Sequence, residues 1–162
     1  MDLFAAFNQS RIVVPQSLSN LLVHLIFSTS NRYPWLQDEW RDELHGYLGG
    51  IVRECGSDLL AINSLEDHVH MLFSLPRTMA MAGLVKEVKV GSSAWIHSKF
   101  SIDKFHWQTG YGAFSVSESH KEAVRRYIAN QREHHRKVSF QEEYRRILER
   151  NGMPFDERYV WD

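Results

Sequence analysis

The stretch from Asp67 to Leu75 constrains the fold more than any other part of the chain, because it places two histidines two residues apart within an apolar run. In a β-strand, successive side chains point to opposite faces of the sheet. One face of this strand then carries His68, His70, Leu72 and Ser74, and the other carries Val69, Met71, Phe73 and Leu75. The pattern predicts an apolar face against a core and two imidazoles side by side on the second face.

Two imidazoles on one strand face can direct their ring nitrogens at a single cation. The pair alone does not establish a metal site, since a strand histidine is more often a hydrogen-bonded or surface residue than a ligand. The best candidate for a third ligand is Gln131, which follows Tyr127 by four residues on a predicted helix, so that both lie on one side. Glu66 and Asp67 are candidates to orient a histidine ring or to act as a ligand, although an acid in a turn is usually solvated.

The composition fits one globular domain over residues 1–162. Of these 162 residues, 43% are hydrophobic and 24% are charged, so the chain is long enough to bury its own core. It has no apolar run of the ~20 residues that a membrane span needs and no signal-peptide pattern, so we expect a cytoplasmic protein. The single cysteine, Cys55, excludes an intramolecular disulfide and a cysteine-rich zinc site. We expect residues 1–16 to form an N-terminal arm and residues 138–162 to form a C-terminal helix and tail.

The net charge of −1 argues against a nucleic-acid partner, since phosphate binding normally needs a basic surface. The charges are unevenly distributed, however, and the local field decides where an anion binds. The candidates for DNA contact in the second half of the chain are Lys86, Lys89, Arg125 and Arg132, with Trp107 for base stacking. The alternative is that the basic side chains lie on solvated helix faces.

Hydrophobic periodicity predicts four strands and four helices. The strands are expected at residues 17–28, 59–65, 67–75 and 106–116, and the helices at residues 35–54, 79–100, 117–136 and 139–152. The short connection between the second and third strands predicts an antiparallel hairpin. This order predicts an α+β fold with helices on one face of a four-stranded antiparallel sheet, as in ferredoxin-like and RNA-recognition domains.

The last two helices carry start signals and a histidine pair. Ser119 and Glu122 fit a capping box at the start of the third helix, and a second box begins at Ser139. Consecutive helix residues point about 100° apart. We therefore expect that His134 and His135 cannot both face the histidine strand, and that they lie on the surface or contact DNA.

The chain resembles the HUH single-tyrosine transposases of bacterial and archaeal insertion sequences, which move as single-stranded DNA; REP-associated tyrosine transposases are the near relatives. The resemblance covers residues from about Ser17 to the end. It is carried by His24-Leu25-Ile26-Phe27-Ser28-Thr29, Asp67-His68-Val69-His70, Trp107-Gln108-Thr109-Gly110-Tyr111-Gly112-Ala113-Phe114-Ser115-Val116-Ser117 and the segment from Tyr127 to His135.

This resemblance implies an HUH fold and a role for each motif residue. Tyr127 would be the nucleophile that forms a 5′-phosphotyrosine link. The metal ligands would be His68, His70 and Gln131, binding Mg²⁺ or Mn²⁺. The substrate would be single-stranded DNA with hairpin ends formed by imperfect palindromes, and the enzyme would be a homodimer whose tyrosine helix docks in cis or in trans. The covalent link retains the bond energy, which fits the absence of a phosphate-loop motif for a nucleotide cofactor.

Other functions are compatible with the same sequence. A non-catalytic single-strand binding module would stack bases on aromatics such as Trp107 and Phe114. A metal-dependent hydrolase would use activated water, with Tyr127 in a structural role. A covalent DNA adduct distinguishes the transposase from both. A domesticated relative would act on dispersed palindromic repeats instead of on a mobile element.

Overall fold

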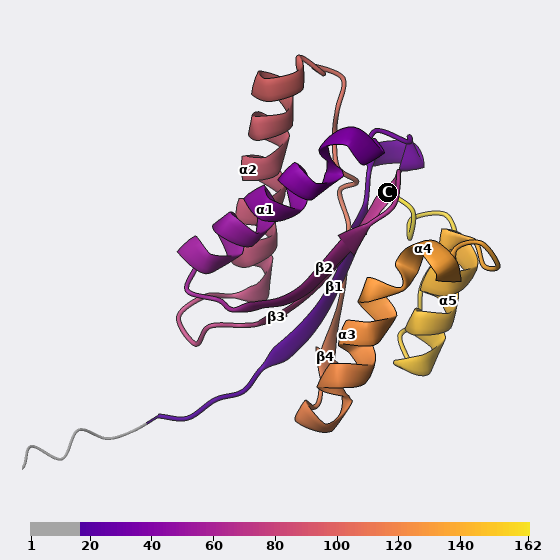
Figure 1. The fold of residues 1–162 in the computed structure, drawn as a ribbon. Helices are drawn as coiled ribbons and strands as arrows, with labels where there is room; N and C mark the ends of the chain where they lie inside the picture. The colour runs from indigo at the N-terminus through magenta and orange to yellow at the C-terminus, as the bar shows by residue number, and fades with distance from the viewer. Residues whose placement is uncertain (1–16) are drawn as a thin grey trace, which may run out of the picture.

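The computed structural model describes residues 17–162, and its centre is a four-stranded antiparallel sheet with the strand order β2-β3-β1-β4 (Figure 1). The strands are β1 (Leu22–Ser28), β2 (Leu59–Ser64), β3 (His68–Ser74) and β4 (Gly112–Val116). The predicted α+β class, the antiparallel sheet and the β2–β3 hairpin are confirmed. The N-terminal arm predicted for residues 1–16 lies outside the described residues.

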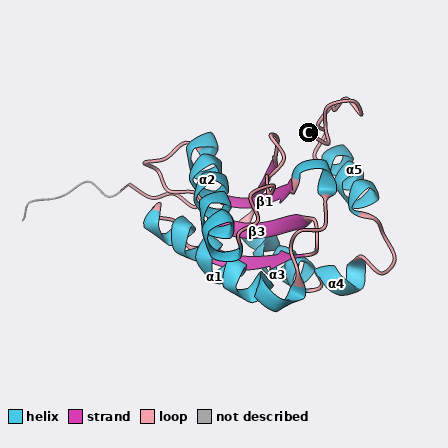
Figure 2. Ribbon diagram, turned by 90° about the horizontal axis from the view of Figure 1, so that it is seen from above, coloured by secondary structure: helices cyan, strands magenta, loops and turns pink. Residues whose placement is uncertain are grey.

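Two long helices, α1 (Asp38–Glu54) and α2 (Met81–Phe100), cover one face of the sheet (Figure 2). The apolar set of β3 is fully buried against them, with Val69, Met71 and Phe73 each 0% exposed. The predicted assignment of these side chains to the core face is therefore confirmed. No helix within residues 17–162 has the length and apolar character needed to cross a membrane.

The C-terminal helices lie on the opposite face, so the helices cover both faces of the sheet and not one as predicted. They are α3 (Lys121–Ala129), α4 (Gln131–His134) and α5 (Phe140–Arg150). Ile128 of α3 packs against Leu72 of β3, and Tyr144 of α5 packs against Phe114 of β4. These contacts arise because β3 and β4 carry apolar side chains on their second face as well, among the polar ones.

One predicted strand begins later than expected, and one predicted helix ends earlier. The strand predicted from residue 106 begins only at Gly112, because the backbone carbonyls of residues 108 and 110 accept hydrogen bonds from Lys89 Nζ at 2.9 and 2.6 Å. The helix predicted through residue 136 breaks at Asn130. Asn63 Nδ2 donates to the carbonyls of Ile128 and Ala129 at 2.9 and 3.1 Å, which an unbroken helix would use internally.

The two predicted capping boxes have different outcomes. The box at Ser139 is confirmed, with its hydroxyl accepting from the Glu142 backbone N–H. The box predicted at Ser119 is wrong, because residues Glu118–His120 form a 3-10 turn and α3 starts after it without a side-chain cap. The C-terminal tail is packed: the Gly110 N–H donates to the carbonyl of Asp162 at 2.8 Å.

Candidate active site

The two histidines of β3 lie on the sheet face that the C-terminal helices cover. His68 and His70 are 1% and 0% exposed, and their rings are 5.3 Å apart between centroids. Strand alternation places them there, and Phe140 of α5 stacks on the His68 ring at 4.2 Å. Both rings are therefore fixed in a buried pocket under α4 and α5.

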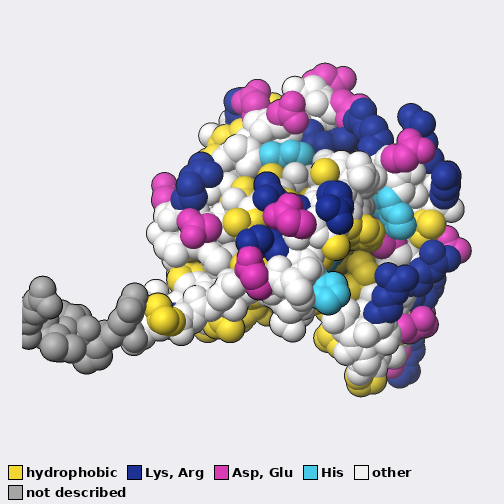
Figure 3. Space-filling view, turned by 60° about the horizontal axis from the view of Figure 1, so that its bottom comes forward, with side chains coloured by type: hydrophobic (Ala, Val, Ile, Leu, Met, Phe, Trp, Pro, Cys, Tyr) yellow, Lys and Arg dark blue, Asp and Glu magenta, His cyan; other side chains and the backbone are white. Residues whose placement is uncertain are grey.

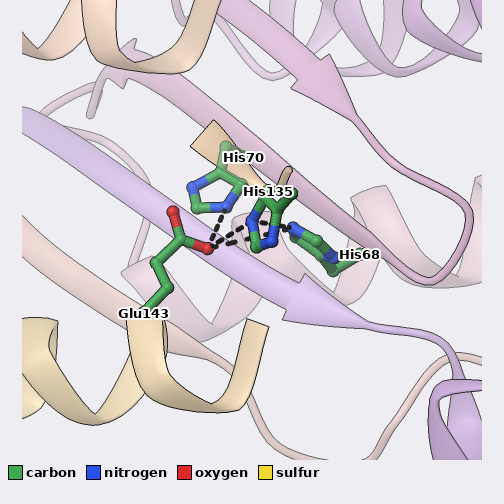
Figure 4. A group of neighbouring side chains, drawn as sticks. All are labelled: His68, His70, His135 and Glu143. Carbon is green, nitrogen blue, oxygen red and sulfur yellow. Dashed lines mark hydrogen bonds and ion pairs between the residues drawn. The ribbon is translucent and has the colours of Figure 1, made fainter. Parts of the chain in front are cut away.

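A buried carboxylate that the sequence reasoning did not identify, Glu143 of α5, lies at the centre of this site (Figure 4). Its Oε2 atom is 2.8 Å from His135 Nε2, 3.5 Å from His70 Nε2 and 4.0 Å from His68 Nε2. His68 Nε2 and His135 Nε2 are 3.2 Å apart. One carboxylate oxygen thus faces three ring nitrogens from β3 and the end of α4.

The second carboxylate oxygen faces the tyrosine helix. Glu143 Oε1 accepts hydrogen bonds from the Tyr127 hydroxyl and, at 3.0 Å, from Gln131 Nε2. His134 Nε2 is 3.6 Å from the same oxygen. The Tyr127 and His70 rings are 6.0 Å apart between centroids. The structure therefore brings the predicted nucleophile, the predicted amide ligand and the two strand histidines around one carboxylate, within a single chain.

Two neighbours orient the strand histidines. Asp67 Oδ1 is 2.6 Å from His68 Nδ1, so this ring presents Nε2 to the centre of the site. His24 of β1 does the same for the second ring, with its Nε2 atom 3.0 Å from His70 Nδ1. Glu66, the other predicted acid, is exposed and makes no side-chain hydrogen bond or ion pair among the described residues.

The electrostatics keep the His24 and His70 rings neutral and the Glu143 carboxylate charged. Burial lowers the pKa of His24 to about 3 and that of His70 to about 4. Burial opposes ionisation of Glu143, but the hydrogen bond from His135 and the adjacent His70 ring outweigh it and hold the pKa of this carboxyl well below its usual range. Burial and the Glu143 charge raise the pKa of Tyr127. Neutral imidazoles beside a carboxylate are the protonation states that metal coordination needs.

The donor set fits a divalent cation. Ligand atoms of His68, His70, His135 and Glu143 all lie within 4.8 Å of one another. Three buried atoms in this region, His70 Nε2, His134 Nε2 and Gln131 Oε1, have no hydrogen-bond partner among the described residues. Buried polar atoms are rarely left unpaired, so these atoms are natural positions for an additional ligand contact.

The expectation that His134 and His135 cannot both face the site is wrong. His135 follows the last residue of α4, and Glu143 presents a different oxygen to each ring. The sequence does contain a signal for Glu143. It lies on the apolar side of α5, three residues after Phe140 and four before Ile147, where an acid is unexpected unless it has buried partners.

The predicted DNA contacts are only partly compatible with the structure. Trp107 is wrong as a stacking platform, because it is buried and donates its indole N–H to Ser92 Oγ at 2.9 Å. Lys89 is committed to backbone carbonyls, and burial lowers its pKa to about 8. Lys86 is exposed on α2, on the far side of the sheet from the histidines.

The two arginines predicted to contact DNA are exposed on the helices that cover the histidine face of the sheet. Arg125 lies on α3 and pairs with Glu122 at 3.1 Å. Arg132 lies on α4 and pairs with Asp38 at 2.6 Å. Exposed pairs of this kind are weak, so both arginines stay available to a phosphate.

Comparisons with known proteins agree with this arrangement. The chain is 27% identical over 114 residues to the ISDra2 transposase TnpA of Deinococcus radiodurans. The matched region covers 67% of this chain and 81% of the relative. A crystal structure of a protein from the same organism, assigned as a transposase, has a TM-score of 0.59 and 28% identity, covering 73% of this chain and 95% of that chain.

A REP-associated tyrosine transposase bound to a REP hairpin has a similar fold, with a TM-score of 0.58 and 16% identity over 77% of this chain and 74% of that chain. The family model described as "Transposase IS200 like" matches residues 17–131, which include β1 to β4, α3 and the first residue of α4. This chain belongs to the IS200-like transposase family.

Proposed function

We propose that this transposase cleaves and rejoins single-stranded DNA by transesterification, with Tyr127 as the nucleophile and a 5′-phosphotyrosine intermediate. One observation carries the proposal: the Tyr127 hydroxyl bonds the same carboxylate that faces His68 and His70. The attacking oxygen and the candidate metal ligands are thus separated by the width of a single carboxylate.

The residues of the chain position the nucleophile for attack. Glu143 accepts the hydrogen bond of the Tyr127 hydroxyl and directs it toward the histidines. A phenol is a weak nucleophile at neutral pH, so its proton must leave as the phosphate is attacked, and Glu143 is the acceptor in contact with it. The free 3′-OH left by cleavage can reverse this step, which rejoins the strand without a nucleotide cofactor.

The metal role follows from the same donor set. His68 and His70 would hold a divalent cation, Mg²⁺ or Mn²⁺ as the family resemblance implies, together with an oxygen ligand from Gln131 or Glu143. When bound, the cation supplies a positive charge that polarises the scissile phosphate. Asp67 and His24 would hold the His68 and His70 rings with their Nε2 atoms directed at the cation.

We propose DNA hairpins formed by imperfect palindromes as the substrate. The structural neighbour bound to a REP hairpin supports this class of DNA, because it shares the fold. Hairpins from dispersed palindromic repeats are the alternative substrate. Cleavage assays with hairpins of both kinds distinguish the two. The non-catalytic binding module is disfavoured, because Trp107, one of the aromatics it would stack bases on, is only 8% exposed and donates its indole N–H to Ser92 Oγ.

The experiment that tests the proposal is a covalent-adduct assay. Labelled single-stranded DNA from both flanks of the gene is incubated with the protein and Mn²⁺ and run on a denaturing gel. We expect a protein–DNA band with the wild type and with Tyr159→Phe, a control at an exposed tyrosine of the tail, and none with Tyr127→Phe. A band of full intensity from Tyr127→Phe would place the nucleophile elsewhere.

A further inference from the structure

A pocket of about 370 Å³ lies directly beside Tyr127, between α3 and α5 and over β4. Figure 3 shows a hollow with a hydrophobic floor and Lys and Arg side chains gathered beside it. The pocket is large enough for one nucleotide, since small-molecule sites begin at about 300 Å³. Its lining residues from the sheet and α3 are His24, Phe114, Ser115, Val116, Ala123, Val124 and Tyr127.

One helical stripe of α5 forms the opposite wall. Its members are Glu143, Arg146, Ile147, Arg150 and Asn151, spaced by three, four, seven and eight residues from the first. This is the spacing of a continuous helix face, so the whole stripe is directed at the pocket. The stripe begins at the active-site carboxylate, carries Arg146 one turn later and ends with Arg150 and the Asn151 amide.

The pocket has an apolar floor and a basic side. Phe114, Val116, Val124 and Ile147 give the floor an apolar character. Arg146 and Arg150 are exposed and form no ion pair within 4.0 Å among the described residues, unlike Arg145 on the same helix, which pairs with Glu157. Free guanidinium groups beside an apolar, aromatic-walled pocket complement a flat base joined to a phosphate.

A second hollow continues from the first on the other side of Tyr127. It has a volume of about 510 Å³ and is lined by Tyr127, Asn130, Glu133, His134, Lys137 and Val138. Tyr127 and His134 line both hollows. A DNA strand that crosses from one hollow to the other therefore passes over the Tyr127 side chain, where the scissile phosphate must lie.

We propose that the pocket between α3 and α5 binds the deoxynucleotide on one side of the scissile phosphate, with its base on the apolar floor and its outer phosphate on Arg146 and Arg150. This inference rests on the proposed function, since that function places a phosphodiester at Tyr127. It assigns substrate binding to α5, which lies beyond the residues that the family model matches.

Small probes test the pocket without a known DNA substrate. Dissociation constants are measured by NMR titration for deoxynucleoside 5′- and 3′-monophosphates, deoxyribose 5-phosphate and inorganic phosphate. We expect the nucleotides to bind about 5- to 100-fold more tightly than deoxyribose 5-phosphate, the range typical of one base in contact with protein aromatics. The preferred phosphate position, 5′ or 3′, identifies the side of the scissile bond.

Two variants separate the base contact from the phosphate contact. Ala123→Trp fills the pocket from an exposed position of α3 and should abolish the preference for nucleotides over deoxyribose 5-phosphate. The double variant Arg146→Ala/Arg150→Ala should weaken every phosphate-bearing probe about tenfold. The matched controls on the far side of the sheet, Ala82→Trp on α2 and Arg53→Ala on α1, should change neither.

The outcomes distinguish the pocket from the proposed function. Equal affinities for nucleotides and deoxyribose 5-phosphate, no binding at millimolar concentrations, or a base preference that survives in Ala123→Trp would each overturn the pocket proposal. The Tyr127 adduct assay is independent of these titrations. A protein that forms the adduct but fails them is a transposase without this subsite, and a protein that passes them without forming the adduct lacks the proposed reaction.

Discussion

The identity of the oxygen ligand in the active site is open to a direct test. The family resemblance implies Gln131, whereas the geometry favours Glu143, whose Oε2 atom faces three ring nitrogens. We predict that Glu143→Gln weakens binding of one Mn²⁺ or Zn²⁺ more than Gln131→Ala does. His70→Ala should abolish it.

The magnitude follows from the distances. Four ligands at about 2.1 Å from a cation in tetrahedral geometry are about 3.4 Å from one another. The contacts of Glu143 Oε2 with His135, His70 and His68, at 2.8, 3.5 and 4.0 Å, and the 3.2 Å between His68 and His135, bracket that value. All the ligand atoms lie within 4.8 Å of one another, so a cation fits after shifts of roughly 1 Å or less.

The loss of metal affinity in Glu143→Gln comes from the missing negative charge, because the amide keeps the shape of the side chain and one of its two oxygens. Perturbing a residue that supports a metal site costs about 10- to 100-fold in affinity, and replacing a charged ligand should reach at least the upper end of this range. A 100-fold loss is about 2.7 kcal/mol of binding free energy. Among the described residues the Gln131 side chain hydrogen-bonds only to Glu143 Oε1, so its loss should cost about tenfold or less in metal affinity.

Calorimetric titration of the metal-free protein measures these affinities, and elemental analysis after dialysis gives the stoichiometry. Glu149→Gln, at an exposed position on the same helix, is the matched control for the loss of one charge. Thermal unfolding without metal shows whether each variant is folded. Wild-type affinity in folded Glu143→Gln, with a large loss in Gln131→Ala, would refute the carboxylate as ligand and support the resemblance-based set.

Three further predictions concern the fold and the assembly. Lys89→Met should lower the free energy of unfolding by about 1–3 kcal/mol in urea titrations, because it leaves two partly buried backbone carbonyls without their donor. The same variant should leave DNA affinity unchanged, and weakened DNA binding at full stability would contradict this prediction. Burial lowers the pKa of His45 to about 4, so between pH 6.5 and 4 the unfolded state takes up a proton that the folded state does not. His45 alone should cost the wild type up to about 3 kcal/mol in this window, in addition to the losses from His24 and His70. His45→Gln should lose correspondingly less than the wild type, with parallel pH profiles as the opposing result. The predicted homodimer is checked by sedimentation, where a monomer at micromolar concentration would exclude a shared active site.

The sequence was sufficient for features that depend on local periodicity. Alternation in residues 67–75 separates the core-facing Val69, Met71 and Phe73 from the two histidines, and the structure has this division. A period of two leaves no other arrangement once one face is apolar. The same reasoning placed Tyr127 and Gln131 on one helical side, where both contact Glu143.

The errors concern contacts between residues distant in sequence. Asn63, more than sixty residues away, competes for two carbonyls of α3 and ends that helix early, which shifts His135 into the site. The sequence predicts Lys89 as a DNA contact, but its ammonium group donates to backbone carbonyls of the loop before β4. Neither interaction leaves a periodic signal, since each is a single side chain reaching a backbone carbonyl in another element.

The C-terminal helix links the nucleophile to the histidines. Its buried side repeats at Phe140, Glu143, Tyr144, Ile147 and Leu148, so the apolar residues fix the rotation of α5 on the sheet. That rotation delivers a carboxylate to the histidines, and the neighbouring stripe delivers two arginines to the pocket beside Tyr127. A charged group at the centre of an apolar stripe is costly unless its partners are already in place. The site and the packing of α5 therefore specify each other, although α5 lies outside the region that the family model matches.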